Sequence, residues 1–171
     1  YDLLLFLIVG KTSLVDIGVG TSITDANVLD MFDWLLNIQM IGMLIGGIVW
    51  GVLGDKKGRL SVLFGSIIMY SLANIANGFV DYAGPYAVEM YAILRFIAGF
   101  GLAGELGAGI TLVSEIMHKE HRGYGTMVVA SIGVTGAIVA ALVGQAGWQI
   151  SYFIGGGLGV SLLLLRIGVF E

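Results

Sequence analysis

The chain has no cysteine, a single proline and few charges for its length. Its 171 residues include eight Lys or Arg and twelve Asp or Glu, so 12% are charged, against about 25% in soluble domains. The lack of cysteine excludes a disulfide scaffold and a thiolate metal site, and we predict no metal and no cofactor. The net charge of −4 argues against a basic surface, so no nucleic-acid partner is expected.

Apolar residues are abundant instead. They make up 57% of the chain, and the mean hydropathy is +0.95. This composition excludes intrinsic disorder, and a soluble domain of this size could not cover so much apolar surface. The 28 glycines show no period of three, which excludes a collagen. We therefore predict an integral, multi-pass membrane protein in contact with the lipid bilayer.

Polar residues divide the apolar sequence into six runs. Each run has about 20 residues or more and is apolar on all faces, which is typical of membrane-spanning helices and not of barrel strands. The predicted spans are residues 3–23, 34–53, 60–80, 86–117, 124–146 and 148–165. The fold class is therefore an all-α membrane protein. The first three spans and the last three begin on opposite sides, which predicts two inverted three-helix repeats, a transporter design.

Basic residues between the spans fall on one side of this topology. That side contains Lys56, Lys57, Arg59, Lys119 and Arg122, with Arg166 at the last exit, whereas the other side contains only the acidic residues Asp25, Asp30, Asp33, Asp81 and Glu89. Cytoplasmic loops carry an excess of Lys and Arg. We therefore predict that both ends of the chain are cytoplasmic, and the short loops favour a bacterial inner membrane.

Small residues recur every four positions in the fifth predicted span. Gly136, Ala140 and Gly144 would form one row on a helix. Because such rows let helix backbones approach closely in lipid, we predict that this row packs against a neighbouring helix.

Four charged residues fall inside predicted spans: Lys11 and Asp16 in the first, and Arg95 and Glu105 in the fourth. A central charge costs about 2.5–3.5 kcal/mol on insertion scales, so these side chains need partners or water. Since the two spans run antiparallel, we expect Lys11 to pair with Glu105 and Asp16 with Arg95. Structural roles stay open for Lys11, Arg95 and Asp16, the last as a helix-end residue. A carboxylate such as Glu105, in apolar surroundings, can take up and release a proton near neutral pH.

The loop between the second and third spans carries a motif. Residues 51–59 read Gly-Val-Leu-Gly-Asp-Lys-Lys-Gly-Arg. Gly58 permits a tight turn, Asp55 can accept a hydrogen bond from Arg59, and Gly51 and Gly54 allow close helix approach. Residues 95–104 read Arg-Phe-Ile-Ala-Gly-Phe-Gly-Leu-Ala-Gly, and residues 115–123 begin with Glu and end with Arg-Gly. These three stretches resemble motifs of the major facilitator superfamily, with Leu60 where a second basic residue is usual, and the resemblance covers all six spans.

The resemblance implies a twelve-helix transporter of which this chain is the amino-terminal half, with the carboxy-terminal half as its partner. It implies that a gating loop latches the two halves through Gly51, Gly54, Asp55, Gly58, Arg59, Glu115 and Arg122. It also implies a role of Arg95 in proton transfer. Gly104 followed by Glu105 resembles the metabolite:proton symporter branch, and Ala137 stands where the antiporter motif has proline.

We predict a secondary active transporter that carries a small polar or anionic metabolite together with protons by alternating access. The predicted proton-coupling residues are Glu105, Asp16 and Arg95, and the predicted substrate-binding residues are Lys11, Glu105 and Asp16. The Lys11 ammonium is a ready point charge for an anionic group. Two alternatives stay open: a proton-independent facilitator or exporter, and a six-helix assembly partner without transport of its own. No enzyme is predicted, because His118 and His121 have no catalytic partners in the sequence.

Overall fold

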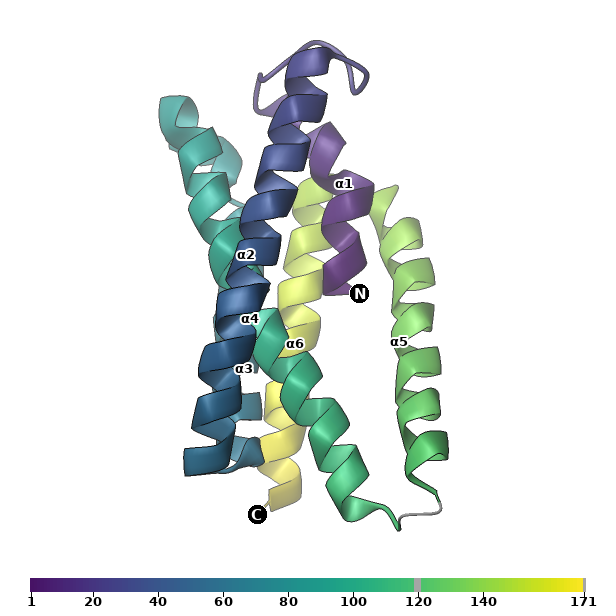
Figure 1. The fold of residues 1–171 in the computed structure, drawn as a ribbon. Helices are drawn as coiled ribbons and strands as arrows, with labels where there is room; N and C mark the ends of the chain where they lie inside the picture. Colours follow the sequence, from purple (N-terminus) through teal and green to yellow (C-terminus); the bar gives the residue numbers. More distant parts are fainter. Residues whose placement is uncertain (119–120, 171) are drawn as a thin grey trace.

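The protein is described by a computed structural model over residues 1–118 and 121–170, without the side chains of residues 2, 3, 116, 122 and 166–170. Its helices are α1 (Asp2–Asp16), α2 (Ala26–Lys57), α3 (Arg59–Asn77), α4 (Ala87–Ile116), α5 (Arg122–Gly144) and α6 (Trp148–Phe170), with a 3-10 helix η1 (Val80–Tyr86) between α3 and α4. Successive α-helices run in alternating directions (Figure 1). The predicted all-α class is confirmed, since the described residues form no strand.

The helices connect at two ends of the molecule. At the upper end in Figure 1 lie residues 17–25, η1 and the turn between α5 and α6. At the lower end lie the turn at Gly58, the end of α4 and the start of α5. We use "upper end" and "lower end" for these two regions. Gly58 has φ 88°, a conformation that favours glycine, and this confirms the tight turn predicted there.

Five helical segments are long and apolar enough to cross a membrane, namely Ala26–Lys57, Arg59–Asn77, Val80–Glu115, Gly123–Gly144 and Trp148–Leu165. The helices α3 to α6 begin within two residues of the predicted spans, and α6 continues to Phe170 beyond the predicted end at 165. The prediction of several apolar spans is therefore confirmed in outline, and the first two spans differ.

The predicted first span is too long. Helix α1 has 15 residues and ends at Asp16, not at residue 23. Gly18 follows with φ 92°, and the chain leaves the helix there. The prediction was wrong at this end because it followed hydropathy. Ile17, Val19 and Ile23 are as apolar as the helix, but their backbone is not helical.

The predicted second span is too short. Helix α2 begins at Ala26, not at residue 34, and ends at Lys57. Its first turns have acidic residues on the exposed side and a buried stripe on the other, made of Val28, Phe32, Leu35, Gln39, Gly42 and Gly46. The stripe has helical spacing, so the polar residues that suggested a loop are one face of an amphipathic helix.

Glycines bring α2 and α4 into backbone contact. A Cβ atom added at Gly42 or Gly46 would collide with the carbonyl oxygen of Phe96 or Phe100, and one at Gly99 would collide with the carbonyl oxygen of Gln39. Small residues permit such close approach of helices in lipid. Helix α4 is therefore fixed against α2 through its middle turns.

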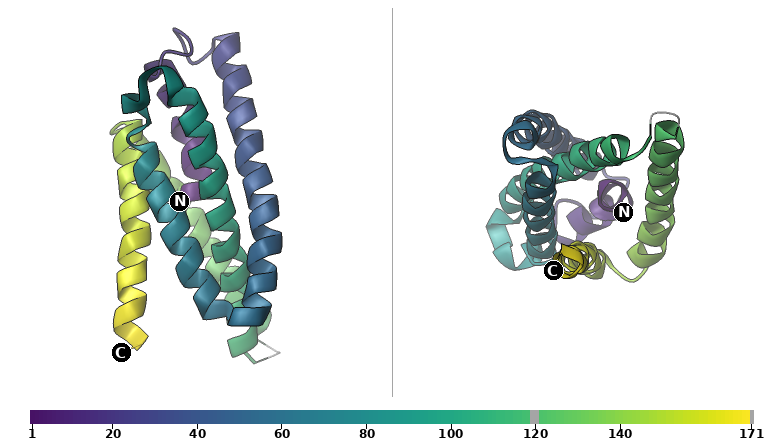
Figure 2. Two further views of the ribbon diagram at one scale, coloured as in Figure 1. Left: turned by 90° about the vertical axis from the view of Figure 1, so that its left-hand side faces the viewer. Right: turned by 90° about the horizontal axis from the view of Figure 1, so that it is seen from below.

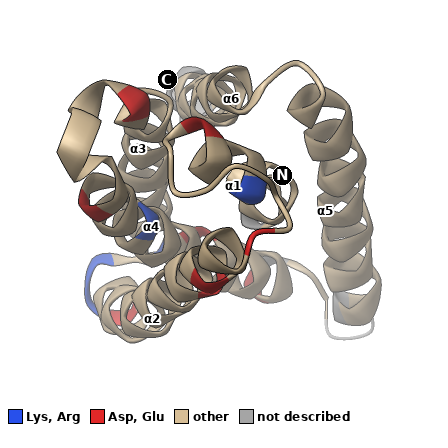
Figure 3. Cartoon of the chain, turned by 90° about the horizontal axis from the view of Figure 1, so that it is seen from above, with Lys and Arg blue, Asp and Glu red and all other residues tan. Residues whose placement is uncertain are grey.

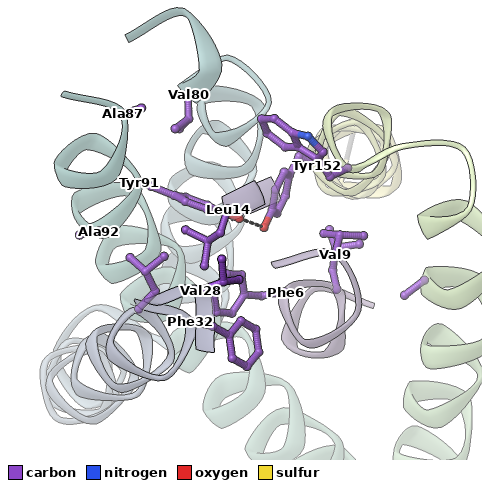
Figure 4. Close-up of a cluster of buried hydrophobic side chains, with 14 residues drawn as sticks. Phe6, Val9, Leu14, Val28, Phe32, Val80, Ala87, Tyr91, Ala92 and Tyr152 are labelled. Carbon is purple, nitrogen blue, oxygen red and sulfur yellow. Dashed lines mark hydrogen bonds between the residues drawn. The ribbon is translucent and has the colours of Figure 1, made fainter. Parts of the chain in front are cut away.

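The main apolar core lies in the upper half, around α1 (Figure 4). It draws side chains from α1, α2, η1, α4, α5 and α6, and its largest members include Phe6, Leu14, Phe32, Tyr91, Trp148 and Tyr152. A smaller cluster of Val62, Leu63 and Ala108 joins α3 to α4 toward the lower end. The upper half is thus the better packed part of the described structure.

Helix α5 contacts its neighbours along one row of small residues. Ala140 is fully buried, and a Cβ atom at Gly144 would lie 3.0 Å from Cγ2 of Ile8 on α1. This confirms the contact predicted for the row of Gly136, Ala140 and Gly144. Seen from below, α5 stands to one side of the molecule with α1 between it and α2 (Figure 2), and most of its large apolar side chains are exposed.

Candidate functional site

The lower end carries an ion-pair cluster built on the turn at Gly58. Arg59 Nη2 lies 3.0 Å from Oδ1 of Asp55, and Arg59 Nε lies 3.6 Å from Oε1 of Glu115. The arginine thus links the end of α2 and the start of α3 to the end of α4. The predicted contact between Arg59 and Asp55 is present as an ion pair, and Glu115 comes from the third motif, 56 positions after Arg59 in the sequence.

The two glycines of this motif differ. A Cβ atom at Gly54 would lie 3.0 Å from Nη1 of Arg59, so Gly54 leaves room for the arginine side chain. Gly51 has open space at its Cβ position and lines a small cavity of about 140 Å³ together with Trp50 and Gly104. Gly51 therefore makes no close helix approach in the described structure. The side chain of Arg122, the last predicted gating residue, lies outside the described residues.

Arg95 on α4 is 1% exposed and is enclosed by aromatic rings. Its Cζ atom lies 5.2 Å from the ring centroid of Phe6, 5.6 Å from that of Tyr91 and 4.8 Å from that of Tyr152. Its Nη2 donates a hydrogen bond to Oδ1 of Asn74 at 3.1 Å, and its Nε has no hydrogen-bond partner among the described residues. This buried cation is held by three aromatic faces and one amide.

A chain of hydroxyl groups runs beside Arg95. The Ser13 hydroxyl donates to the carbonyl oxygen of Gly10 at 2.8 Å and lies 2.8 Å from the Tyr91 hydroxyl. The Tyr91 hydroxyl lies 2.6 Å from that of Tyr152, and the two rings point toward one another in Figure 4. These contacts join α1, α4 and α6 across the core of the upper half.

Lys11 lies on the other side of the same aromatic group. Its Nζ is 5.3 Å from the ring centroid of Phe32, which stacks on Phe6 with centroids 5.0 Å apart and an interplanar angle of 19°. Lys11 is half-buried, whereas Phe6 is fully buried. The Lys11 ammonium and the Arg95 guanidinium therefore each contact one ring of the stacked pair formed by Phe32 and Phe6.

Neither of the two expected ion pairs forms among the described residues. Asp16 is the last residue of α1, and its Oδ2 accepts a hydrogen bond from Trp148 Nε1 at 2.7 Å. Lys11 contacts Phe32 instead of Glu105. The pairings Asp16–Arg95 and Lys11–Glu105 are wrong because Asp16 lies at the helix end and Lys11 turns toward the aromatic side of α2.

Glu105 lines a cavity of about 860 Å³ in the lower half. The wall is formed by residues of α3, α4, α5 and α6, together with Leu4 of α1 and Tyr1, which precedes α1. Glu105 is half-buried and carries the one charged side chain among the described residues of this wall, beside Thr126 and Gly133. The structure thus separates Glu105, at the cavity, from Lys11 and Arg95, at the aromatic group.

Several residues of this arrangement were not predicted as site residues, chiefly Phe6, Phe32, Asn74, Tyr91 and Tyr152. Tyr91 stands four positions before Arg95, so it lies on the same face of α4. That spacing is a signal in the sequence. The sequence carries no such signal for Phe32, because this residue lies before the predicted second span, which begins at residue 34.

The described charges also sort by end. The upper end has only acidic residues, namely Asp16, Asp25, Asp30, Asp33, Asp81 and Glu89, and Figure 3 shows red residues on α1, α2 and α4 in the view from above. The lower end combines Lys56, Lys57 and Arg59 with Asp55 and Glu115. At the upper end Asp25 accepts from the backbone N–H groups of Ser22 and Thr21 and from the Thr21 hydroxyl, and these bonds hold its pKa below the ordinary value.

Comparison with known proteins decides the family. The sequence profile of the Major Facilitator Superfamily matches residues 4–170. The chain belongs to the major facilitator superfamily. It is therefore a multi-pass membrane protein, and the relatives that it matches carry the names of transporters. No solved structure matches the chain at a significant level.

Three relatives in this superfamily illustrate the range of named substrates. The niacin transporter NiaP of Acinetobacter baylyi is 38% identical over 128 residues, covering 72% of this chain and 28% of its own length. The benzoate transport protein of the same organism is 30% identical over 139 residues, 75% of this chain and 28% of its own length. The low affinity inorganic phosphate transporter 4 of Petunia hybrida is 30% identical over 112 residues, 65% of this chain and 21% of its own length. The chain spans less than a third of the length of these relatives.

Proposed function

We propose that the chain is the amino-terminal half of a secondary active transporter that carries a small anionic metabolite together with protons. The observation that carries this proposal is a pair of cations, Lys11 and Arg95, that contact the stacked rings of Phe32 and Phe6. Among the described residues, no carboxylate forms an ion pair with either cation. Charged groups in an apolar interior need a partner. A transported anion is the partner that a carrier can supply.

The relatives support an anionic substrate. Niacin and benzoic acid are aromatic carboxylic acids, and inorganic phosphate is an anion at neutral pH, so all three named substrates carry negative charge near neutrality. Their chemistry differs otherwise, so the shared feature is the charge. We propose that Lys11 binds the anionic group, and that Asp16 acts through its bond to Trp148 by fixing the upper ends of α1 and α6.

Glu105 is the group that we propose as the proton carrier. It lies in the wall of the lower cavity among apolar residues, where a carboxylate can exchange a proton with water. Arg95 lies ten positions earlier on the same helix, roughly 15 Å along the axis. We infer that Arg95 assists coupling through its positive field, because its contacts are aromatic rings and Asn74 and not an acid.

The lower end supports a gating role. The proposed latch consists of Arg59, Asp55, Glu115 and the turn at Gly58, with Gly54 against the Arg59 side chain. We propose Arg122 as a further member of this latch. We propose that this cluster biases the carrier between two access states. In this proposal the lower end is cytoplasmic in a bacterial inner membrane, a second six-helix half completes the carrier, and α1–α3 and α4–α6 are inverted repeats. The opposite directions of α1 and α4 support the repeat (Figure 1).

Uptake in proteoliposomes tests the proposal. Benzoate or nicotinate uptake is measured with and without an inward proton gradient, for the chain together with its carboxy-terminal half and for the chain alone. Glu105→Gln should abolish gradient-driven accumulation and leave exchange of preloaded substrate. Glu89→Gln, a change of an exposed acid on the same helix, is the matched control.

The outcomes separate the alternatives. Uptake that ignores the gradient in the unmodified carrier would favour a proton-independent facilitator or exporter. Gradient-driven accumulation that survives in Glu105→Gln would remove the proposed role of Glu105. Absence of uptake in every preparation, with stable assembly of the two halves, would favour the assembly partner.

A further inference from the structure

The aromatic group of the upper half has a positive charge on each side. The order is Lys11, Phe32, Phe6 and Arg95, with separations of 5.3 Å, 5.0 Å and 5.2 Å between successive centres. Helix α1 supplies Lys11 and Phe6, α2 supplies Phe32, and α4 supplies Arg95. Three helices therefore meet where two stacked rings each contact a cation.

The negative charges nearby do not neutralise this stack. Asp16, at the end of α1, lies five positions from Lys11, and its carboxylate accepts a hydrogen bond from Trp148 Nε1. Arg95 faces Asn74 from α3 and the phenol of Tyr152 from α6. Ring faces attract cations but carry no net charge, so the described residues leave two positive charges here without a counterion.

The two cations differ in access. Arg95 is 1% exposed, whereas Lys11 is half-buried. Lys11 lies four positions after Leu7 and three after Ile8, which are 47% and 40% exposed, so it shares the open face of α1. An incoming anion can therefore reach the Lys11 ammonium. The buried Arg95 guanidinium attracts the same anion through its positive charge, without direct contact.

We propose that Lys11 and Phe32 form a binding subsite for a planar aromatic carboxylate. The carboxylate binds the Lys11 ammonium and draws it away from the Phe32 ring, and the ring of the ligand packs in its place on the face that the ammonium leaves. The ligand ring then extends the stack of Phe6 and Phe32. This inference rests on the proposed function, since it names the substrate class of the proposed anion site.

An aromatic ligand fits this subsite better than an aliphatic one of the same charge. Two aromatic rings in offset-stacked or edge-to-face contact attract each other beyond the area that they bury. The Lys11 ammonium lies 5.3 Å from the centroid of the Phe32 ring, so a part of that ring becomes available when the ammonium turns to the carboxylate. A phosphate would bind the ammonium without using the ring.

Benzoate and cyclohexanecarboxylate test the proposal, because they match in charge and size and differ in the aromatic ring. Equilibrium binding of each acid is measured on membranes that contain the complete transporter. We expect benzoate to bind about 3- to 10-fold more tightly than cyclohexanecarboxylate. Phe32→Leu should bring this ratio close to one, and Phe32→Tyr, which keeps an aromatic face, should retain it.

Lysine variants separate the charge from the ring. Lys11→Gln should weaken binding of both acids about 10-fold or more and leave their ratio unchanged. Lys57→Gln, at an exposed lysine of the lower end, should change neither affinity. Size-exclusion elution and helical circular dichroism check that each variant folds.

Two results would overturn the subsite and leave the proposed function intact. One is equal affinity for the two acids in the unmodified protein, with uptake of either acid still driven by the proton gradient. The other is an unchanged affinity ratio in Phe32→Leu. If neither acid nor phosphate binds or is taken up, both the subsite and the proposed function fail.

Discussion

The two ends of the molecule neutralise their charges by opposite means. At the lower end Arg59 meets two carboxylates, Asp55 and Glu115, whose side chains are 71% and 54% exposed. In the upper half Arg95 meets aromatic rings and an amide, and at the upper end Asp25 meets backbone N–H groups. At the lower end, ions of opposite charge neutralise each other. In the upper half and at the upper end, uncharged groups stabilise the ions.

This difference has a functional meaning for a carrier of anions. An arginine paired with acids presents little net charge to a ligand, and it can form and break contacts at a surface with small free-energy changes. A cation that lies against aromatic rings is stabilised in the protein interior, and because the rings carry no net charge, its positive charge is not neutralised. The first chemistry suits a latch, and the second suits a site that must attract an anion.

Glycine substitutions on α4 should give the largest effects, because they test the close packing on which the upper half depends. Gly99→Ala places a Cβ atom against the carbonyl of Gln39 and should destabilise the fold by about 3 kcal/mol. Gly107→Ala, lower on the same helix with open space at its Cβ position, should stabilise by about 0.5–1 kcal/mol. Thermal unfolding in detergent measures both, and equal unfolding midpoints would contradict the described packing of α2 on α4.

Replacing Arg95 by an uncharged side chain tests whether its charge serves binding more than folding. Arg95→Met should lower substrate affinity about 30-fold, the equivalent of about 2 kcal/mol. The unfolding midpoint should change by only a few degrees, because the rings of Phe6, Tyr91 and Tyr152 can pack on the methionine. Substrate binding and thermal unfolding are measured on the same preparation. The opposite result would show that the Arg95 charge serves folding more than binding. In that case most of the variant protein is unfolded, and the folded fraction binds substrate with unchanged affinity.

Salt should distinguish the lower end from the upper half. Arg59→Gln should lower the unfolding midpoint by about 1–2 °C at low salt, since exposed pairs are worth about 0.5 kcal/mol. Raising the salt concentration to about 1 M should remove this difference, because the ion pairs are screened. Lys57→Gln is the control, and a salt-independent effect of Arg59→Gln would contradict the comparison.

The smallest effect is expected in the α1–α2 loop. The hydrogen bonds from the backbone N–H groups of Ser22 and Thr21 lower the pKa of Asp25 in the folded state. These bonds therefore stabilise the folded loop fully above the ordinary pKa of 3.8, and this stabilisation is lost as the pH falls through the lowered pKa. Hydrogen exchange of the Thr21 and Ser22 amides should therefore accelerate at acidic pH after correction for the intrinsic rate. Asp25→Asn should show the faster exchange already at neutral pH, whereas Asp30→Asn should behave like the unmodified protein.

The sequence predicted most of the helices and the latch, because both depend on local signals. Length and hydropathy located α3 to α6 within two residues at their starts, and the spacing of Gly58 and Arg59 indicated the turn and the bond to Asp55. Hydropathy failed at the polar start of α2, where one face is solvated and the other is buried. It also failed after Asp16, where Gly18 turns the chain away from the helix.

The partners of the intramembrane charges could not be predicted from spacing. Counting charges on antiparallel spans suggested that Lys11 and Arg95 would each meet an acid. The actual partners are rings on four helices, α1, α2, α4 and α6, and aromatic residues in a membrane protein are too common to single out by sequence. Only the position of Tyr91, four residues before Arg95, marked one of them in advance.

The bond between Trp148 and Asp16 gives the protein an optical probe of its own. Trp148 is 2% exposed and joins α6 to the end of α1, whereas Trp34 is 48% exposed on α2. Any movement that parts the upper ends of α1 and α6 admits water to this indole and shifts its fluorescence emission to longer wavelength. With Trp34 and Trp50 replaced by phenylalanine, a single unlabelled tryptophan would report in real time when the upper end opens.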